Sequence, residues 1–108
     1  MKLPNSDSVQ IPEEKLRRYL LSTDHAIGHF KARFFSGLGF TADNWKELRA
    51  RLRELARGDV ELGPATKYGQ KYLTFGRLEG SKGTGDVVVV WILLAGDDTP
   101  RLVTVYPR

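Results

Sequence analysis

The spacing of apolar side chains changes near the middle of the chain, from a helical repeat to a pattern typical of strands. Before residue 58, apolar residues recur three or four positions apart. After Gly63-Pro64, aromatic and β-branched residues form runs that are separated by glycine-rich turns. Helices followed by hairpin-linked strands are typical of an α+β domain, with helices packed on one face of an antiparallel sheet. We therefore expect a single α+β domain over residues 1–108.

Three helices are predicted in the first half of the chain. They cover about residues 12–21, 28–38 and 42–57. Pro12 suits the first position of a helix, and Thr41 suits the N-cap of the third helix. The third helix is the most regular, because its apolar residues form one stripe and Gly58 suits its C-terminal end. The stripe, which we expect in the core, comprises Trp45, Leu48, Leu52 and Leu55.

Four strands are predicted in the second half, as an antiparallel meander. They cover about residues 60–62, 68–78, 86–95 and 101–106. The third strand is almost continuously apolar, so we expect it to be central and covered on both faces, with Val88, Val90 and Ile92 in the core. Residues 80–85 hold three glycines and predict a hairpin turn, because the G-K-S/T signature of a phosphate-binding loop is missing.

The last strand carries candidate phosphate ligands. Simple alternation divides it into two faces, with Leu102, Thr104 and Tyr106 on one and Arg101, Val103 and Val105 on the other. Thr104 and Tyr106 would then present two neighbouring hydroxyl groups to a phosphate. The same residues also suit a purely structural strand, since threonine favours strands and tyrosine packs well in a core. Both interpretations remain open from the pattern alone.

Charge and composition narrow the class of function. The chain has a net charge of +4 and no cysteine, which excludes disulfides, thiolate nucleophiles and cysteine-ligated zinc. Five cations against two acids lie between residues 45 and 57, a bias that favours polyanions but is also typical of a solvated helix face. The longest apolar run has nine residues, too few to span a membrane. We expect a cytoplasmic protein without membrane contact, although a toxin cut from a larger secreted parent would look the same.

Both histidines, His25 and His29, lie just ahead of two cations, Lys31 and Arg33. Histidine exchanges protons near neutral pH, and lysine and arginine stabilise the charge of a phosphodiester. Three interpretations are open: acid–base catalysis, a structural role at the start of the helix, and a metal site built on the H-x-x-x-H spacing. Beyond Asp24 or a distant carboxylate there is no obvious third ligand, so we expect neither a metal nor another cofactor. Tyr68 and Lys71 open a strand and suit either base stacking or the core.

Several short motifs resemble an uncharacterised family of small bacterial domains, found alone and at the C-termini of larger secreted or phage-associated chains. The motifs are Lys2-Leu3-Pro4-Asn5, His25-x-x-Gly28-x-x-Lys31-Ala32-Arg33-x-Phe35, Tyr68-Gly69-x-Lys71-Tyr72, Trp91 and Pro100-Arg101-Leu102-Val103-Thr104-x-Tyr106-Pro107. That family is in turn similar to the barnase–EndoU–colicin–RelE group of metal-independent ribonucleases. The resemblance implies N-terminal helices packed against a four-stranded antiparallel sheet.

The resemblance also implies an activity, a toxin-like ribonuclease that cleaves RNA by attack of the 2′-hydroxyl. The catalytic residues would be His25 as general base or acid, Lys31 and Arg101 as charge stabilisers, and Thr104 and Tyr106 as phosphate ligands. Arg33, Tyr68 and Lys71 are candidates for substrate binding. This mechanism requires His25, Lys31, Arg101 and Thr104 to meet in one cleft. The family further implies a neutralising partner, a cognate antitoxin or immunity protein. The alternative is a non-catalytic module that binds a protein or nucleic acid through a basic face.

Overall fold

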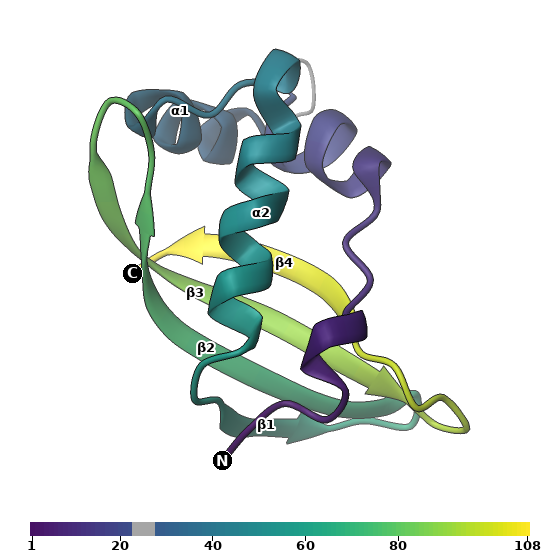
Figure 1. Cartoon of the computed structure of the whole chain (residues 1–108). Helices are drawn as coiled ribbons and strands as arrows, with labels where there is room; N and C mark the ends of the chain where they lie inside the picture. Colours follow the sequence, from purple (N-terminus) through teal and green to yellow (C-terminus); the bar gives the residue numbers. More distant parts are fainter. Residues whose placement is uncertain (23–27) are drawn as a thin grey trace.

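The computed structural model describes residues 1–22 and 28–108 and confirms the α+β arrangement (Figure 1). Its α-helices in these residues are α1 (Gly28–Leu38) and α2 (Trp45–Ala56). The strands are β1 (Glu61–Ala65), β2 (Gly69–Glu79), β3 (Thr84–Leu94) and β4 (Arg101–Pro107). They pair antiparallel in the order β1-β2-β3-β4, which is the predicted meander. Within the described residues, no helix is both long and apolar enough to cross a membrane.

The first predicted helix is present but wound more widely than an α-helix. Its main part, η2 (Lys15–Leu20), is a π-helix, and the Leu21 amide donates to the Leu16 carbonyl oxygen at 2.8 Å, five residues back. Leu16 and Leu20 are fully buried, so the apolar positions seen in the sequence do face the core. Tyr19 lies between them and packs against the core with part of its ring. Short 3₁₀ turns, η1 (Ser6–Ser8) and η3 (Ala42–Asn44), complete the helical part.

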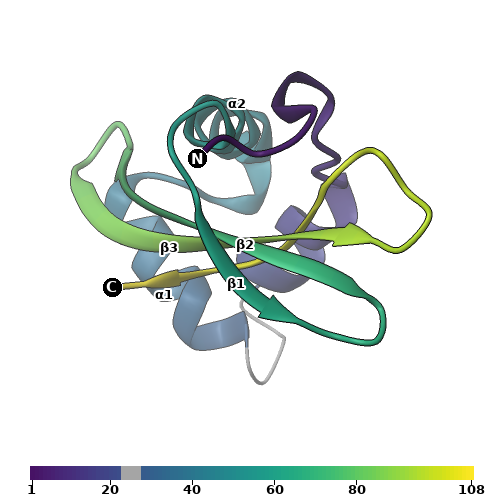
Figure 2. The ribbon, with the colours of Figure 1, turned by 90° about the horizontal axis from the view of Figure 1, so that it is seen from below.

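The third predicted helix, α2, packs across one face of the sheet (Figures 1 and 2). Thr41 begins it through η3, and the Thr41 amide donates to the Asn44 side-chain oxygen at 2.7 Å. Leu48 and Leu52 are fully buried, as the stripe predicts. Trp45 and Leu55, at the margins of the stripe, are partly buried and pack against the same core. We call the sheet face under α2 the inner face.

The central strand β3 contributes buried side chains to both faces of the sheet, as predicted, but the main core cluster holds the residues that alternate with the predicted ones. Val87, Val89 and Trp91 point to the inner face and are fully buried. Val88 and Val90 are also buried, at 3% and 7% exposure, while Ile92 is partly buried. These three residues lie on the other face of the sheet, because side chains alternate along a strand. A continuous apolar run does not reveal which set faces the helices.

Strand β4 contains a bulge that changes which side chains share a face. Leu102 pairs with Trp91 and Thr104 with Val90, so the residue between them, Val103, is extra. Leu102 and Val105 can therefore both enter the core, at 4% and 0% exposure, although they are three positions apart. The prediction from simple alternation was wrong on this point, because it placed Arg101 on the face opposite Thr104 and Tyr106. The bulge brings all three to one face.

Candidate functional site

The sheet face opposite α2 (Figure 2), which we call the outer face, carries four of the eight candidate residues. Partners in register across β2, β3 and β4 form rows on this face. The rows are Lys71–Ile92–Arg101, Leu73–Val90–Thr104, Phe75–Val88–Tyr106 and the pair Arg77–Asp86. Four candidate residues of the sequence analysis, one on β2 and three on β4, thus share one surface.

Lys31 joins this surface from α1, which lies beyond the β4 edge of the sheet (Figure 1). Its ammonium Nζ donates to Thr104 Oγ1 at 2.6 Å and to the Tyr19 hydroxyl at 3.2 Å. Nζ also lies 5.0 Å from the centre of the Tyr19 ring. We call these three residues the Lys31 cluster. An ammonium has three N–H donors, so two of them fix the cation between hydroxyl groups from two other elements.

The Lys31 cluster changes the acidity of its phenol. The hydrogen bond from Lys31 is the largest cause that lowers the pKa of Tyr19 below its usual value. Burial opposes this shift, whereas the hydrogen bond with Thr104 and the charges of Lys31 and Lys15 add to it. Lys15 Nζ lies 5.6 Å from the ring centre of Tyr19. The site therefore combines a fixed positive charge with a phenol whose proton is easier to remove.

The other candidate residues differ in their relation to the Lys31 cluster. Arg101 lies on the outer face at the start of β4 and forms an ion pair of 3.2 Å with Asp97. Lys71 lies in the same row as Arg101, one row beyond that of Thr104 on this face. Arg33 is exposed and is rotated about 200° around α1 from Lys31. Tyr68 lies in the β1–β2 turn, about 17 Å along β2 from the row of Thr104.

The predicted convergence is therefore met in part. The structure brings Lys31 and Thr104 into contact, and it places Arg101 and Tyr106 on the same face as Thr104. His25 lies outside the described residues, so its role as general base or acid stays a prediction, as does the metal site considered for the histidine pair.

Sequence reasoning missed Tyr19, because its position in an apolar stripe indicated packing alone. Lys15, four residues earlier on the same helical turn, was the available signal that a cation lies near its ring.

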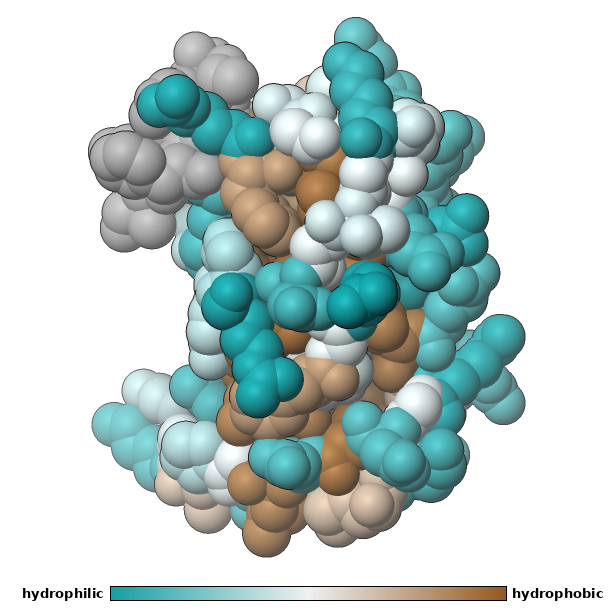
Figure 3. Space-filling model, turned by 90° about the vertical axis from the view of Figure 1, so that its left-hand side faces the viewer, coloured by the Kyte–Doolittle hydropathy of each residue, from teal (hydrophilic) through white to brown (hydrophobic). Residues whose placement is uncertain are grey.

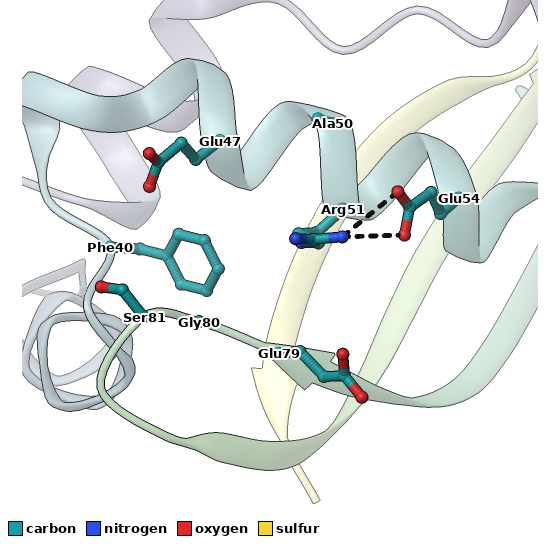
Figure 4. A pocket seen from close by; sticks show the side chains of 8 residues that line it. All are labelled: Phe40, Glu47, Ala50, Arg51, Glu54, Glu79, Gly80 and Ser81. Carbon is teal, nitrogen blue, oxygen red and sulfur yellow. Dashed lines mark hydrogen bonds and ion pairs between the residues drawn. The ribbon is translucent and has the colours of Figure 1, made fainter.

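A separate concavity of about 510 Å³ lies between α2 and the β2–β3 turn (Figure 4). Glu47 and Glu54 on α2 and Glu79 on β2 line it, and Arg51 Nη1 contacts both Glu54 carboxylate oxygens at 3.3 Å. Three carboxylates against one guanidinium disfavour a polyanion in this pocket. No set of three or more His, Cys, Asp or Glu side chains within residues 1–22 and 28–108 is placed to hold a metal ion.

Comparison with known proteins identifies the chain only at the level of its family. Searches of curated proteins and of solved structures each gave no match. Residues 2–108 match the family described as "Domain of unknown function (DUF6883)". The match covers the helices, the sheet and every residue of the Lys31 cluster. The chain therefore belongs to DUF6883, an uncharacterised domain family.

Proposed function

We propose that this protein is a toxin-like, metal-independent endoribonuclease whose Lys31 cluster holds the scissile phosphodiester. One observation carries the proposal: the ammonium of Lys31 is fixed between the hydroxyl groups of Tyr19 and Thr104. Such a group is a preorganised donor for the charge that develops on a phosphorane, and it needs no rearrangement when the reaction begins. Arg101 and Tyr106, on the same face, can contact further phosphate oxygens. The resemblance that the sequence motifs imply to the barnase–EndoU–colicin–RelE group is a second ground for proposing this chemistry.

The reaction uses the ribose as nucleophile. A general base removes the 2′-hydroxyl proton, and the 2′-oxygen attacks the adjacent phosphorus. The bond from phosphorus to the 5′-oxygen then breaks, and a general acid protonates that oxygen, which leaves a 2′,3′-cyclic phosphate. We assign the base to His25. Tyr19 is suited to act as the general acid, because a hydrogen bond from Lys31 lowers the pKa of its phenol and so makes its proton easier to release.

The test is cleavage of a fluorescently labelled RNA in buffer containing EDTA. Lys31→Met keeps most of the side-chain length but removes the charge, and we expect activity to fall about 100- to 1000-fold. Tyr19→Phe and His25→Ala should each lower activity about 100-fold or more, as loss of an acid or base does. Lys67→Met is the matched control, because Lys67 Nζ also lies over an aromatic ring, 5.1 Å from the centre of Tyr68, but in the β1–β2 turn.

Three results would overturn the proposal. The wild-type protein could fail to cleave any RNA in a broad set of substrates. The Lys31→Met variant could cleave as fast as the wild type. Alternatively, EDTA could abolish the activity and an added divalent metal restore it. Circular dichroism and thermal unfolding of each variant separate loss of activity from loss of the fold.

A second function is favoured by the exposed side of α2. Lys46, Arg49 and Arg53 are spaced three and four residues apart, which places them on one side of the helix. The Arg49 guanidinium lies 4.6 Å from the ring centre of Trp45. No carboxylate among residues 1–22 and 28–108 forms an ion pair with these cations. This surface suits a non-catalytic module for an acidic protein or a nucleic acid.

The two functions make different predictions. A binding module cleaves nothing, and its affinity falls with salt and with substitution of Arg49 or Arg53. For a nucleic acid, each lost phosphate contact reduces the slope of log affinity against log salt by about 0.7–0.9.

The ribonuclease proposal carries expectations for partner and compartment. An enzyme that cleaves RNA must act where RNA is present, which we propose to be the cytoplasm. It also requires neutralisation in the cell that makes it, by a cognate antitoxin or immunity protein. Coexpression with the product of the adjacent gene tests this: the neighbour should restore growth of cells that express the wild-type protein, and it should have no effect on cells that express Lys31→Met.

A further inference from the structure

Two aromatic side chains are exposed in the same row of the outer face. Phe75 on β2 and Tyr106 on β4 are each 40% exposed, and they flank Val88 on β3. Val88 itself is only 3% exposed. Large aromatic side chains on a sheet normally pack against a helix or a second sheet. Here α2 covers the inner face, so neither ring owes its position to the helix (Figure 2).

The two rings project from strands that are not neighbours, because β3 lies between β2 and β4. They are two strands apart, which corresponds to about 9.5 Å across the sheet. Aromatic rings contact each other when their centres are about 4.5–7 Å apart. The backbone positions of Phe75 and Tyr106 are farther apart than this range, so each ring can accept its own planar group from a ligand. A base stacked on an aromatic side chain contributes about 1–3 kcal/mol to nucleic-acid binding.

One platform already holds a planar cation. The guanidinium of Arg108 lies 4.8 Å from the ring centre of Phe75. An exposed cation–π contact contributes about 0.5–1 kcal/mol, less than a stacked base, so a base can displace Arg108 from the ring. The released guanidinium would then be close to the phosphate of the nucleotide that replaced it.

Cations lie at both ends of this surface. Lys71 and Arg101 lie on either side of Ile92 in the row at one end of the surface. Arg77 and Arg108 lie at the other end. Asp86 pairs with Arg77 at 3.5 Å, an exposed pair whose partners are 67% and 61% accessible. Exposed pairs of this kind contribute only about 0–1 kcal/mol, so they do not prevent contact with a phosphate. Polar and apolar surface alternate on the side of the molecule where β4 ends (Figure 3).

The aromatic row also lies close to the Lys31 cluster. Tyr106 is two residues from Thr104 on the same face of β4, which is about 6.8 Å along the strand. A nucleotide stacked on Tyr106 can therefore place its phosphate beside Lys31 and Thr104.

From these observations we infer that the outer face binds single-stranded RNA, with successive bases stacked on Tyr106 and Phe75 and phosphates on the flanking cations. The inference rests on the proposed ribonuclease function for the point of cleavage, but its binding step stands apart. Single strands are the required substrate, because bases in a duplex are already stacked and their faces are not available. The inference adds Phe75 and Arg108 to the residues that select the substrate.

The experiment measures binding without cleavage. A fluorescent twelve-nucleotide RNA carrying 2′-O-methyl groups cannot be cut by 2′-hydroxyl attack, and fluorescence anisotropy gives its dissociation constant. The same strand annealed to its complement is the duplex probe. Phe75→Leu and Tyr106→Leu remove the rings but keep apolar side chains, and each should weaken single-strand binding about 5- to 150-fold, the range expected for one lost stack. Leu62→Ala, an exposed side chain on β1, is the control and should bind as the wild type.

The outcomes separate this inference from the proposed function. Weaker binding by both ring variants, with unchanged unfolding temperatures and a preference for the single strand, supports the inference even if unmodified RNA is never cleaved. Equal binding by the ring variants and the wild type overturns the inference, even if cleavage by the Lys31 cluster is demonstrated. Tighter binding of the duplex, or no binding of either probe, also overturns it. A protein that binds this face, when neither RNA probe does, would also overturn the inference and would identify the occupant.

Discussion

Replacing Thr74 by valine tests the packing that holds β2 and β3 together beneath the candidate site. The Thr74 side chain is buried on the inner face at 3% exposure, and its Oγ1 accepts a hydrogen bond of 3.0 Å from Trp91 Nε1. Trp91 is fully buried. Valine has nearly the same shape but offers a methyl group in place of the hydroxyl. The indole N–H would then be buried without an acceptor, because no water can reach it.

The expected cost follows from two opposing contributions. A buried donor without a partner destabilises a protein by about 1–3 kcal/mol. The additional buried methyl group contributes about 0.8 kcal/mol in the opposite direction. Subtracting the gain of the methyl group from the cost of the unpaired donor leaves a net loss in the free energy of unfolding. We expect this loss to be about 1–2 kcal/mol. For a domain of 108 residues this corresponds to a fall in the melting temperature of about 4–15 °C.

Urea unfolding followed by tryptophan fluorescence measures this change, and a double-mutant cycle with Trp91→Phe isolates the hydrogen bond. In the Trp91→Phe background the donor is gone, so Thr74→Val should cost little or become favourable. The coupling free energy should then be about 1 kcal/mol or more. Thr84→Val, at an exposed position of β3, is the control and should change stability by less than about 0.5 kcal/mol. Additive effects in the cycle, or equal losses for Thr74→Val and Thr84→Val, would refute the reasoning.

Two further predictions concern the site and the backbone. In an ultraviolet titration, one tyrosine should ionise below the usual pKa; this step should vanish in Tyr19→Phe and move up in Lys31→Met. Because the pKa of Tyr19 is lowered in the folded state, its ionisation stabilises the fold as the pH rises from that pKa toward about 10. The difference in stability between the wild type and Tyr19→Phe should therefore grow in favour of the wild type over this pH range. An unchanged titration in Lys31→Met would contradict the cluster. Gly69→Ala should lower the free energy of unfolding in urea by about 1–3 kcal/mol, because its Cβ would overlap the Leu93 carbonyl oxygen. Gly37→Ala is the control and should not lower it, because there is open space around Gly37 in α1. Equal effects of the two substitutions would be evidence against this packing.

Local patterns were sufficient to predict the elements of the fold. The stripe of α2 contains Leu48 and Leu52, and its period alone indicates a helix with one buried side. The strand order followed from short connections, since consecutive strands joined by tight turns pair as neighbours. The winding of η2 was not predictable, because a helix with i to i+5 bonds has almost the same apolar spacing over six residues as an α-helix.

The site was predictable only where it depends on residue type. Lys31 and Thr104 were chosen for their chemistry, and their contact across 73 positions depends on how α1 packs beside β4. Patterns of neighbouring residues do not predict a contact between positions that are so far apart in the sequence. Tyr19 was missed because its spacing indicated a core position. At the margin of the core, a tyrosine can pack its ring against apolar residues while its hydroxyl forms a hydrogen bond.

The bulge at Val103 links the stability of the sheet to the geometry of the site. β4 is an edge strand, and an edge that is left regular and open can pair with another chain. A bulge disrupts such an edge, and α1 lies beside it, so both features protect β4 from unwanted pairing. The same bulge turns Arg101 to the outer face, and the same helix delivers Lys31 to Thr104. A candidate site at this edge therefore arises from features that also protect the edge from pairing with another chain, and its residues come from three elements, η2, α1 and β4.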